Sequence, residues 1–340
     1  MAAKSYAQWP TGSTAVQYLA EKEVLETAPA FETLNLATDT RTMKAGMGAA
    51  IDLRRWLTPA VDATPAPEGT QKSARTLVPE DFIGTMLRYT ERIQVTRVDA
   101  DLSPWDAVQG SKDRLRQLIL STREKIRFNA GVSGTNVLYN SSAITTRATV
   151  NGPLSAGRLQ IIIRNLEAAK GFVFTEAMGG AAKEGTSPIE PAYFAFCHSN
   201  LQPDIRALPG FQRAADYPGA KKHFREFGAW QNIRFFTTPE ATYFPGAGAA
   251  STTMLNTGGT AGTADVYPII ICGQHALTSV TLSGAGSSGE GNLKITVLDQ
   301  PDKYDPNNNW IDIVSNWYDL CMVTSNDWLW RFEVATTANP

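Results

Sequence analysis

The chain has 340 residues, of which 43% are hydrophobic and 19% are charged, with a formal net charge of −2 and a pI of about 6.0. This near-neutral charge excludes a dedicated nucleic-acid-binding protein, which would usually be strongly basic. The apolar fraction is enough for one large domain or two ordinary ones with a real core. Because the charged fraction is below the roughly 25% of typical soluble proteins, we expect either a surface partly hidden in contacts with other chains or a large core under a Ser/Thr-rich surface.

The cysteines, the N-terminus and the length of the apolar runs indicate the cellular compartment. Cys197, Cys272 and Cys321 are widely spaced, lie in or beside apolar runs and form no CxxC pair, so they predict buried free thiols in a reducing compartment. The N-terminus lacks the apolar core of a signal peptide, and the longest strongly apolar run, 266–272, is far too short to span a membrane. We therefore expect a protein made in the cytoplasm, without a membrane partner.

The N-terminal quarter of the chain is dominated by a long predicted hairpin. A short helix is expected at 13–27 and irregular structure at 31–48. The run 51–57 then alternates apolar and polar residues as a half-buried strand does, and a return run covers 76–98. The tip between them, 58–73, is rich in proline and charge and has almost no large apolar side chain. An isolated two-stranded ribbon is marginal in water, so we expect this hairpin to lie on the rest of the chain or on a neighbouring copy.

A long helix is predicted to follow the hairpin. Ser103 is expected to cap it, Pro104 to take its first position and Gly131 to end it. At 1.5 Å per residue, about 27 residues make a rod of roughly 40 Å. One face is apolar. The opposite face is basic, and we interpret it as solvated; it comprises Lys112, Arg116, Arg123, Lys125 and Arg127.

The rest of the chain mixes helical and strand patterns, so the predicted fold class is α+β. Further helices are expected at 154–170 and 198–208. Strands are expected at 144–150, 193–197, 230–236, 267–273, 278–282 and 293–298, followed by an antiparallel closing set at 310–314, 318–324 and 328–334. The stretch 246–263 is rich in Gly, Ala and Thr and is expected to be a mobile loop.

Patterns that resemble catalytic or ligand sites are weak in this chain. Residues 284–289 read G-x-G-x-x-G, but a strand follows them instead of the helix whose N-terminus would hold a pyrophosphate. Cys197 and His198 are neighbours on a predicted strand, so their side chains point to opposite faces. Three aspartates within 299–305 lack the glycine and closing glutamate of a calcium loop, which favours a turn over a surface cation. The sequence therefore predicts no catalytic residue, no cofactor and no metal.

The order of these parts resembles the major capsid proteins of tailed bacteriophages, and most of all the subfamily typified by coliphages that carry a virion RNA polymerase. The resemblance lies in the order of the predicted segments and in their residue patterns, and not in an invariant motif. The segments that carry it are 50–57, 110–131, 193–199, 232–239, 267–271 and 311–334. It implies five parts: an N-terminal arm at 1–48, an extended hairpin loop at 49–100, a peripheral domain with a spine helix at 101–171, an axial domain at 172–290, and peripheral C-terminal strands at 291–340.

This resemblance implies a structural protein and not an enzyme. The chain would self-assemble as hexamers and pentamers into an icosahedral head, located in the virion capsid and assembled in the host cytoplasm. It would enclose double-stranded DNA without binding it specifically. The implied partners are a scaffolding protein, a portal protein and, in some heads, a decoration protein. A separate scaffolding protein is favoured because only about 50 residues precede the hairpin.

The resemblance also implies that the hairpin loop lies across the next subunit. The candidate assembly contacts on it are Arg54, Arg55, Trp56, Asp62, Glu68 and Lys72. Lys72 and an asparagine of 307–309 are formally available for the crosslink that some relatives make. Two alternatives stay open: a bacterial nanocompartment shell of the same fold, and a soluble enzyme that uses Cys197 or His198.

Overall fold

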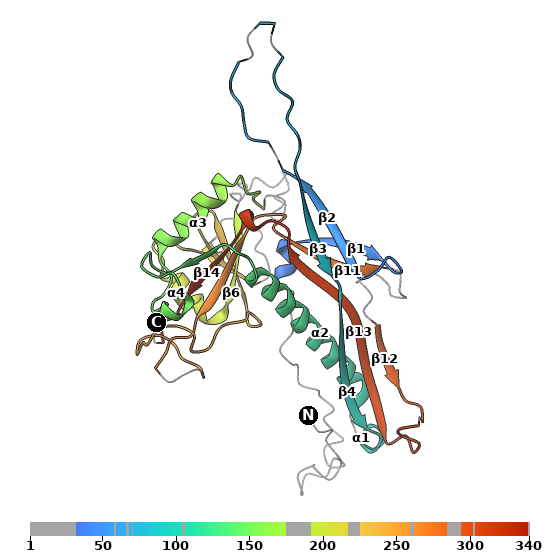
Figure 1. The fold of residues 1–340 in the computed structure, drawn as a ribbon. Helices are drawn as coiled ribbons and strands as arrows, with labels where there is room; N and C mark the ends of the chain where they lie inside the picture. Colours follow the sequence, from blue (N-terminus) through green and yellow to red (C-terminus); the bar gives the residue numbers. More distant parts are fainter. Residues whose placement is uncertain are drawn as a thin grey trace.

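The computed structural model describes residues 32–57, 59–65, 68–69, 71–103, 106–174, 192–216, 225–258, 262–283, 294–301 and 303–338. The helix expected at 13–27 and the glycine-rich sequence at 284–289 lie outside these residues. Two sheets form the body, the long helix α2 runs alongside one of them, and a narrow arm projects from the body (Figure 1).

A five-stranded sheet is organised by one long strand. It consists of β1 (Thr38–Lys44), β11 (Leu277–Ser283), β13 (Trp310–Val323), β12 (Lys294–Leu298) and β4 (Leu87–Thr96). The break expected between 310–314 and 318–324 is wrong, because buried residues alternate with more exposed ones from 310 to 320 and Asn316 pairs with Thr90 in the middle of the ladder. The segment 31–48, predicted to be irregular, contributes β1, which pairs in parallel with β11.

Helix α2 (Ala107–Val132) packs its apolar side against this sheet. Leu115 and Ile119 are fully buried in a cluster with Ile313 and Trp317. The predicted Ser103 cap is wrong: the short helix α1 (Arg97–Leu102) ends at Ser103, and the Asp106 carboxylate caps α2 by accepting a hydrogen bond from the Gln109 amide at 2.8 Å. The predicted solvated basic face is also wrong in part, since two of its arginines, at 123 and 127, are buried.

A seven-stranded sheet forms the other side of the body. Its strands, in spatial order, are β5 (Val137–Tyr139), β14 (Leu329–Val334), β10 (Tyr267–Cys272), β6 (Tyr193–His198), β9 (Ile233–Thr238), β8 (Glu226–Trp230) and β7 (Gln212–Arg213). Helix α3 (Ala156–Ala168) covers one face with its buried leucines and isoleucines. Phe128 near the end of α2 packs on the opposite face among Phe194, Phe196 and Phe236, which joins the helix to both sheets.

Short helical turns connect these strands. They are η2 (Leu34–Ala37), η3 (Arg147–Thr149), η5 (Ser199–Leu201), α4 (Gln202–Arg206), η6 (Ala214–Asp216) and η7 (Asn326–Trp328). The strand expected at 144–150 is wrong, because that stretch holds η3. The strand expected at 230–236 is two strands, since the chain reverses at Gln231, whose φ is +47°. The turn at 199–201 is capped by the His198 ring, which accepts a hydrogen bond from the Asn200 amide at 3.1 Å.

Strand pairing crosses the predicted boundaries between the five parts of the chain. Strand β4, assigned to the extended loop 49–100, pairs with β13 over ten residues. Strand β11, assigned to 172–290, joins the five-stranded sheet, while β14, assigned to the C-terminal strands 291–340, pairs with β10 in the seven-stranded sheet. Hydrogen-bond ladders link residues that are far apart in sequence, so composition along the chain could not reveal these partners.

The Gly/Ala-rich stretch 246–263 is anchored to the body where it is described. Asp265 is fully buried and accepts hydrogen bonds from the Gly246 amide at 2.7 Å and from the Thr257 amide at 2.8 Å. A Cβ atom on Gly248 would lie 2.6 Å from the Val150 carbonyl oxygen, so only glycine fits this close approach. The described part of this stretch, expected to be a loop, is therefore hydrogen-bonded to the body.

Candidate assembly surface

The projecting arm comprises β2 (Ala50–Trp56), the loop 57–78 and β3 (Pro79–Thr85). The two strands pair with each other in antiparallel register from Ala50–Thr85 to Trp56–Pro79, which confirms the strand predicted at 51–57. The described residues of the loop have no regular secondary structure, and Figure 1 shows the loop extending well beyond the body. The arm therefore has three surfaces to consider: the two faces of the ribbon and the tip of the loop.

The inner face of the ribbon lies on the chain's own five-stranded sheet. Ile51 packs against a small cluster of Met43, Met86 and Val280. A Cβ atom on Gly84 would lie 2.7 Å from a Leu320 methyl carbon, so the ribbon approaches β13 closely. The root of the arm therefore has a core within its own molecule, and only the part beyond it projects.

Arg55 ties the ribbon to the junction of the two sheets. Its guanidinium donates to the Glu80 carboxylate across the ribbon at 2.6 Å and lies 5.3 Å from the centre of the Phe82 ring. The same guanidinium lies 5.4 Å from the ring centre of Trp328, in the turn between β13 and β14. Cation–π contacts of this kind hold a side chain against an aromatic face. Arg55 therefore helps to set the direction in which the arm leaves the body.

We expect Arg55→Ala to loosen the root of the arm and Arg54→Ala to leave it unchanged, because only Arg55 contacts the body through Trp328. The stability cost should be small in both variants, because ion pairs of exposed side chains contribute little to stability. Hydrogen–deuterium exchange of the peptide covering 79–85 measures the difference. Equal exchange in the two variants would contradict this role for Arg55.

The outer face of the ribbon is exposed and carries apolar side chains. Trp56 is 57% exposed and Ile83 is 73% exposed. Between them, Arg54 and Asp81 form a bidentate ion pair. The guanidinium nitrogens of Arg54 lie 2.6 and 2.8 Å from the two carboxylate oxygens of Asp81. This pairing lowers the pKa of Asp81 and raises that of Arg54, so both stay charged near neutrality. The face thus offers apolar contact area around a neutralised pair of charges.

The tip is held by contacts among its own polar side chains. Asp62 accepts hydrogen bonds from Thr64 and forms ion pairs with Lys72 at 3.0 Å and with Arg75 at 3.1 Å. Hydrogen bonds from Thr64, and then from Lys72, lower the pKa of Asp62 to about 2. These contacts brace a segment with no core of its own.

Apolar residues of the arm remain exposed. The exposed fractions are 84% for Val61, 42% for Leu57, 53% for Leu77 and 57% for Val78. Together with Trp56 and Ile83 they lie along the arm, which favours contact with another surface over permanent exposure to water.

The six predicted contact residues thus fall into different environments. Arg54, Asp62 and Lys72 are engaged in ion pairs within the arm, while Arg55 also faces the body. Trp56 and Glu68 are exposed. Sequence reasoning missed Glu80 and Asp81, although the order Arg54-Arg55 on one strand and Glu80-Asp81 on the other was a signal of the register. It also missed Ile83 and Trp328, for which no local pattern existed.

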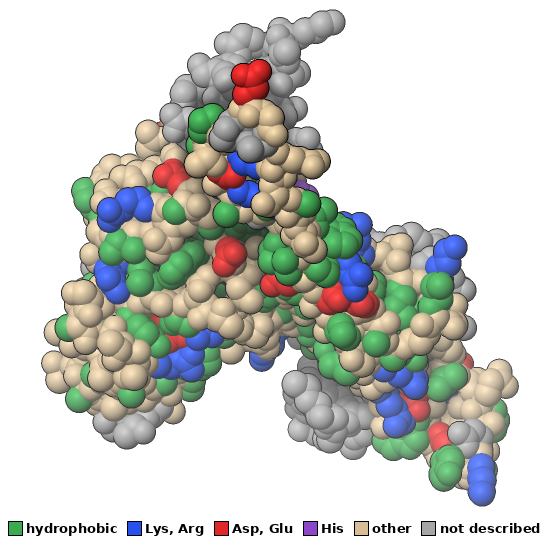
Figure 2. All heavy atoms as spheres, turned by 45° about the horizontal axis from the view of Figure 1, so that its top comes forward, with side chains coloured by type: hydrophobic (Ala, Val, Ile, Leu, Met, Phe, Trp, Pro, Cys, Tyr) green, Lys and Arg blue, Asp and Glu red, His purple; other side chains and the backbone are tan. Residues whose placement is uncertain are grey.

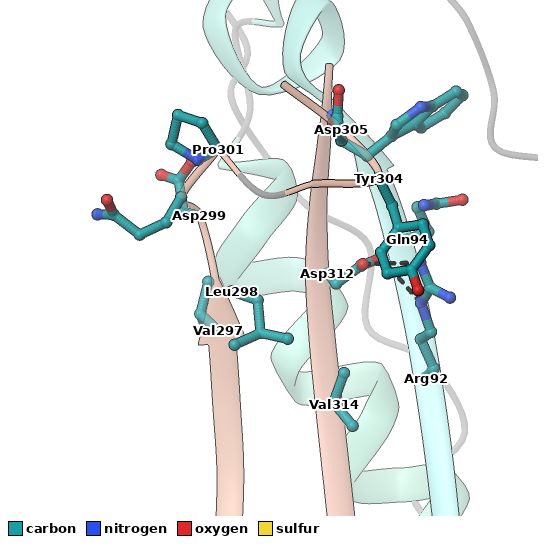
Figure 3. Close-up of a pocket in the computed structure, with 12 residues that line it drawn as sticks. Arg92, Gln94, Val297, Leu298, Asp299, Pro301, Tyr304, Asp305, Asp312 and Val314 are labelled. Atoms are coloured by element: carbon teal, nitrogen blue, oxygen red, sulfur yellow. Dashed lines mark hydrogen bonds and ion pairs between the residues drawn. The ribbon is translucent and has the colours of Figure 1, made fainter. Parts of the chain in front are cut away.

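A hollow of about 720 Å³ lies at the far end of the five-stranded sheet (Figure 3). Arg92 of β4 and Asp312 of β13 form a two-pronged ion pair in its lining, with distances of 3.0 and 2.7 Å. Exposed Leu298 and Tyr304 border it, with exposed fractions of 54% and 89%. The lining combines exposed apolar side chains with a neutralised pair of charges, as the outer face of the arm does. Such a lining is more typical of a contact surface than of a substrate pocket.

The candidate enzymatic and metal residues have structural roles. Burial raises the pKa of the Cys197 thiol, and this thiol donates to the Phe236 carbonyl at 3.5 Å, so it is neutral and enclosed. Asp299 pairs with Arg97, and Asp305 accepts from the Trp310 amide at 2.9 Å, as a turn requires. Among the described residues, no group of three or more His, Cys, Asp or Glu side chains could hold a metal ion.

Charge is mixed over the surface. Figure 2 shows acidic and basic side chains interspersed with apolar ones, without a continuous field of one sign on the face in view. This distribution agrees with the formal net charge of −2. None of the described helices is long and apolar enough to cross a membrane.

Across its length, the chain has the α+β fold of the major capsid proteins of tailed phages, which confirms the predicted fold class. It is similar to the capsid protein of Ralstonia phage GP4, with a TM-score of 0.62, 11% identity and complete coverage of both chains. It is equally similar to the capsid protein of cyanophage Pam1, with a TM-score of 0.62, 10% identity and 99% of each chain covered.

The chain is also similar to a chain in the head structure of Helicobacter pylori bacteriophage KHP40. The TM-score is 0.54 and the identity is 12%, with 92% of this chain and 93% of the phage chain covered. No protein-family model and no curated protein matches the sequence. At such identities the similarity is one of fold.

Proposed function

We propose that this protein is the major capsid protein of a tailed phage, a structural subunit that assembles into an icosahedral head around packaged double-stranded DNA. The observation that carries the proposal is the end-to-end similarity to the capsid protein of Ralstonia phage GP4. Near-neutral charge supports it, because a shell wall that neutralised many phosphates would grip the genome in a salt-dependent way. The location would be the virion capsid, with assembly in the host cytoplasm.

The arm is the part that we assign to contact between subunits. Its exposed apolar residues and its reach beyond the body favour a position across a neighbouring copy. Trp56 and Glu68 would contact that neighbour directly, while Arg54, Asp62 and Lys72 would keep the arm in shape for it. Arg55 would set the direction of the arm from its own molecule. Hexamers and pentamers would both be built on this contact.

The finer assignments rest on the order of segments in the sequence. We propose the five-part division into N-terminal arm, extended loop, peripheral domain, axial domain and C-terminal strands, with strands exchanged between sheets as described above. We also propose a scaffolding protein and a portal protein as partners, and membership of the subfamily whose phages carry a virion RNA polymerase. Mass spectrometry of purified virions would test the subfamily, and virions without that polymerase would remove it.

Expression of the full chain, with and without its neighbouring genes, followed by electron microscopy tests the function. We expect closed icosahedral particles when a scaffolding protein is supplied. A chain that stays monomeric under all these conditions would overturn the proposal. Closed particles that form without phage genes and enclose an enzyme would instead identify a bacterial nanocompartment.

A further inference from the structure

Five charged side chains are buried together where the described chain begins, between the residues that lead into η2, helix α2 and strand β13. Each side chain is buried or nearly so. They are Glu32, Arg123, Glu124, Arg127 and Asp319. Buried charges are costly unless they are paired, so a cluster of five requires an explanation.

Two arginines hold Glu32. The Arg127 guanidinium donates to one Glu32 carboxylate oxygen at 2.6 Å, and the Arg123 guanidinium lies 3.1 Å from the other. Arg123 also lies 3.4 Å from Asp319 on β13. Both positive charges are therefore engaged by two carboxylates, and these pairs hold Glu32 against helix α2.

The third carboxylate, Glu124, binds the backbone. Its two oxygens accept from the Leu34 amide at 3.1 and 3.3 Å, and they also receive hydrogen bonds from the Thr33 backbone and the Thr238 side chain. Burial raises the pKa of Glu124 to about 7, and these hydrogen bonds and the charge of Arg127 offset only part of that effect. The Cys321 thiol of β13 interacts with Arg127 and Asp319 of this cluster; burial raises its pKa to about 12, so it stays neutral.

The imbalance between acidic and basic groups makes the cluster sensitive to protonation. Three ionised carboxylates against two guanidinium groups leave one uncompensated negative charge in the interior, whereas protonation of Glu124 leaves the cluster neutral. We propose that Glu124 is a proton-controlled latch that fastens residues 32–34 to helix α2, tight when its carboxyl group is protonated and loosened when that group is ionised.

The direction of the pH effect follows from linkage. The pKa of Glu124 is raised from its ordinary 4.5 to about 7 when the latch is closed, so opening the latch releases a proton. The latch is therefore tightest in mild acid, weakens as the pH rises between these two values, and changes little above 7. Asp319, whose pKa burial also raises, acts in the same direction, and Arg127 stays charged throughout.

Hydrogen–deuterium exchange on the full-length, unassembled subunit tests the latch. The reporter is the Leu34 amide, after division by the exchange rate of an unstructured peptide of the same sequence. We expect its protection to fall about tenfold or more between pH 5.5 and pH 7.5. The buried amide of Leu115 in the same molecule should change little, because its helix packs through apolar contacts.

Two variants separate the latch from general effects of pH. Glu124→Gln keeps the shape and one acceptor oxygen, and should make the protection of Leu34 nearly independent of pH, close to the wild-type value at pH 5.5. Asp113→Asn removes an exposed carboxylate of the same helix and should retain the wild-type profile. Flat protection of Leu34 in the wild type, or the same pH profile in Glu124→Gln, would overturn the latch.

Discussion

Deletion of residues 59–73 is expected to leave a folded subunit that no longer closes shells. The deleted stretch makes its ion pairs within the arm, and such exposed pairs contribute little to stability. Leu57 and Val78 still close the ribbon through their backbone hydrogen bond of 3.0 Å, and the remaining residues form a short loop of ordinary length. Circular dichroism measures the fold, and electron microscopy of assembly reactions measures shells.

A length-matched variant shows what the tip contributes. Replacing 59–73 by the same number of Gly and Ser residues preserves the reach of the arm but removes Asp62, Glu68 and Lys72. Failure of both variants means that side chains of the tip make the contact, whereas failure of the deletion alone means that reach is what matters. Normal particles from the deletion variant would refute the assignment of the arm to assembly.

Replacing Arg127 with leucine is expected to lower the free energy of unfolding by roughly 3 to 5 kcal/mol, the usual cost of removing one partner from a buried ion pair. Arg127 is 2% exposed, and it donates to Glu32 at 2.6 Å. Its removal leaves three buried carboxylates to share the single charge of Arg123. Chemical denaturation followed by tryptophan fluorescence measures the loss.

Arg116 provides the matched control on the same helix. It is 63% exposed and its ion pair with Asp113 spans 3.3 Å, so Arg116→Leu should change stability by no more than about 0.5 kcal/mol. Arg127→Lys, which keeps the charge but not the planar fork, should fall between the two. Equal stability of Arg127→Leu and Arg116→Leu would show that the buried cluster does not support the fold.

The buried arginines show the limit of a one-dimensional reading of charge. A helical face with Arg116, Arg123 and Arg127 is typical of a solvated surface, and only the first of these is exposed. Their counterions come from residue 32, before the hairpin, and from residue 319, near the end of the chain. No spacing along the helix indicates such partners, so burial of this face could not be predicted.

The arm was predicted in outline, but its contacts within the chain were not. Alternation at 51–57 and the proline-rich tip correctly indicated a long ribbon. The return run, however, divides at Met86, after which β4 leaves the arm and pairs with β13. Arg55, chosen from sequence as a contact with a neighbour, faces Trp328 of its own molecule. Alternation marks which residues share a face of a strand, but not which surface that face meets.

From the sequence alone follow the α+β class, the ribbon with its unsupported tip, the long helix and the buried strands at 193–197 and 267–273, because local periodicity encodes them. Tertiary structure alone decided the unbroken course of β13, the parallel pairing of β1 with β11 and the charge cluster around Glu124. These features depend on ladders and ion pairs between residues up to 239 positions apart, as in the pairing of Thr38 with Leu277, for which a single sequence carries no local signal.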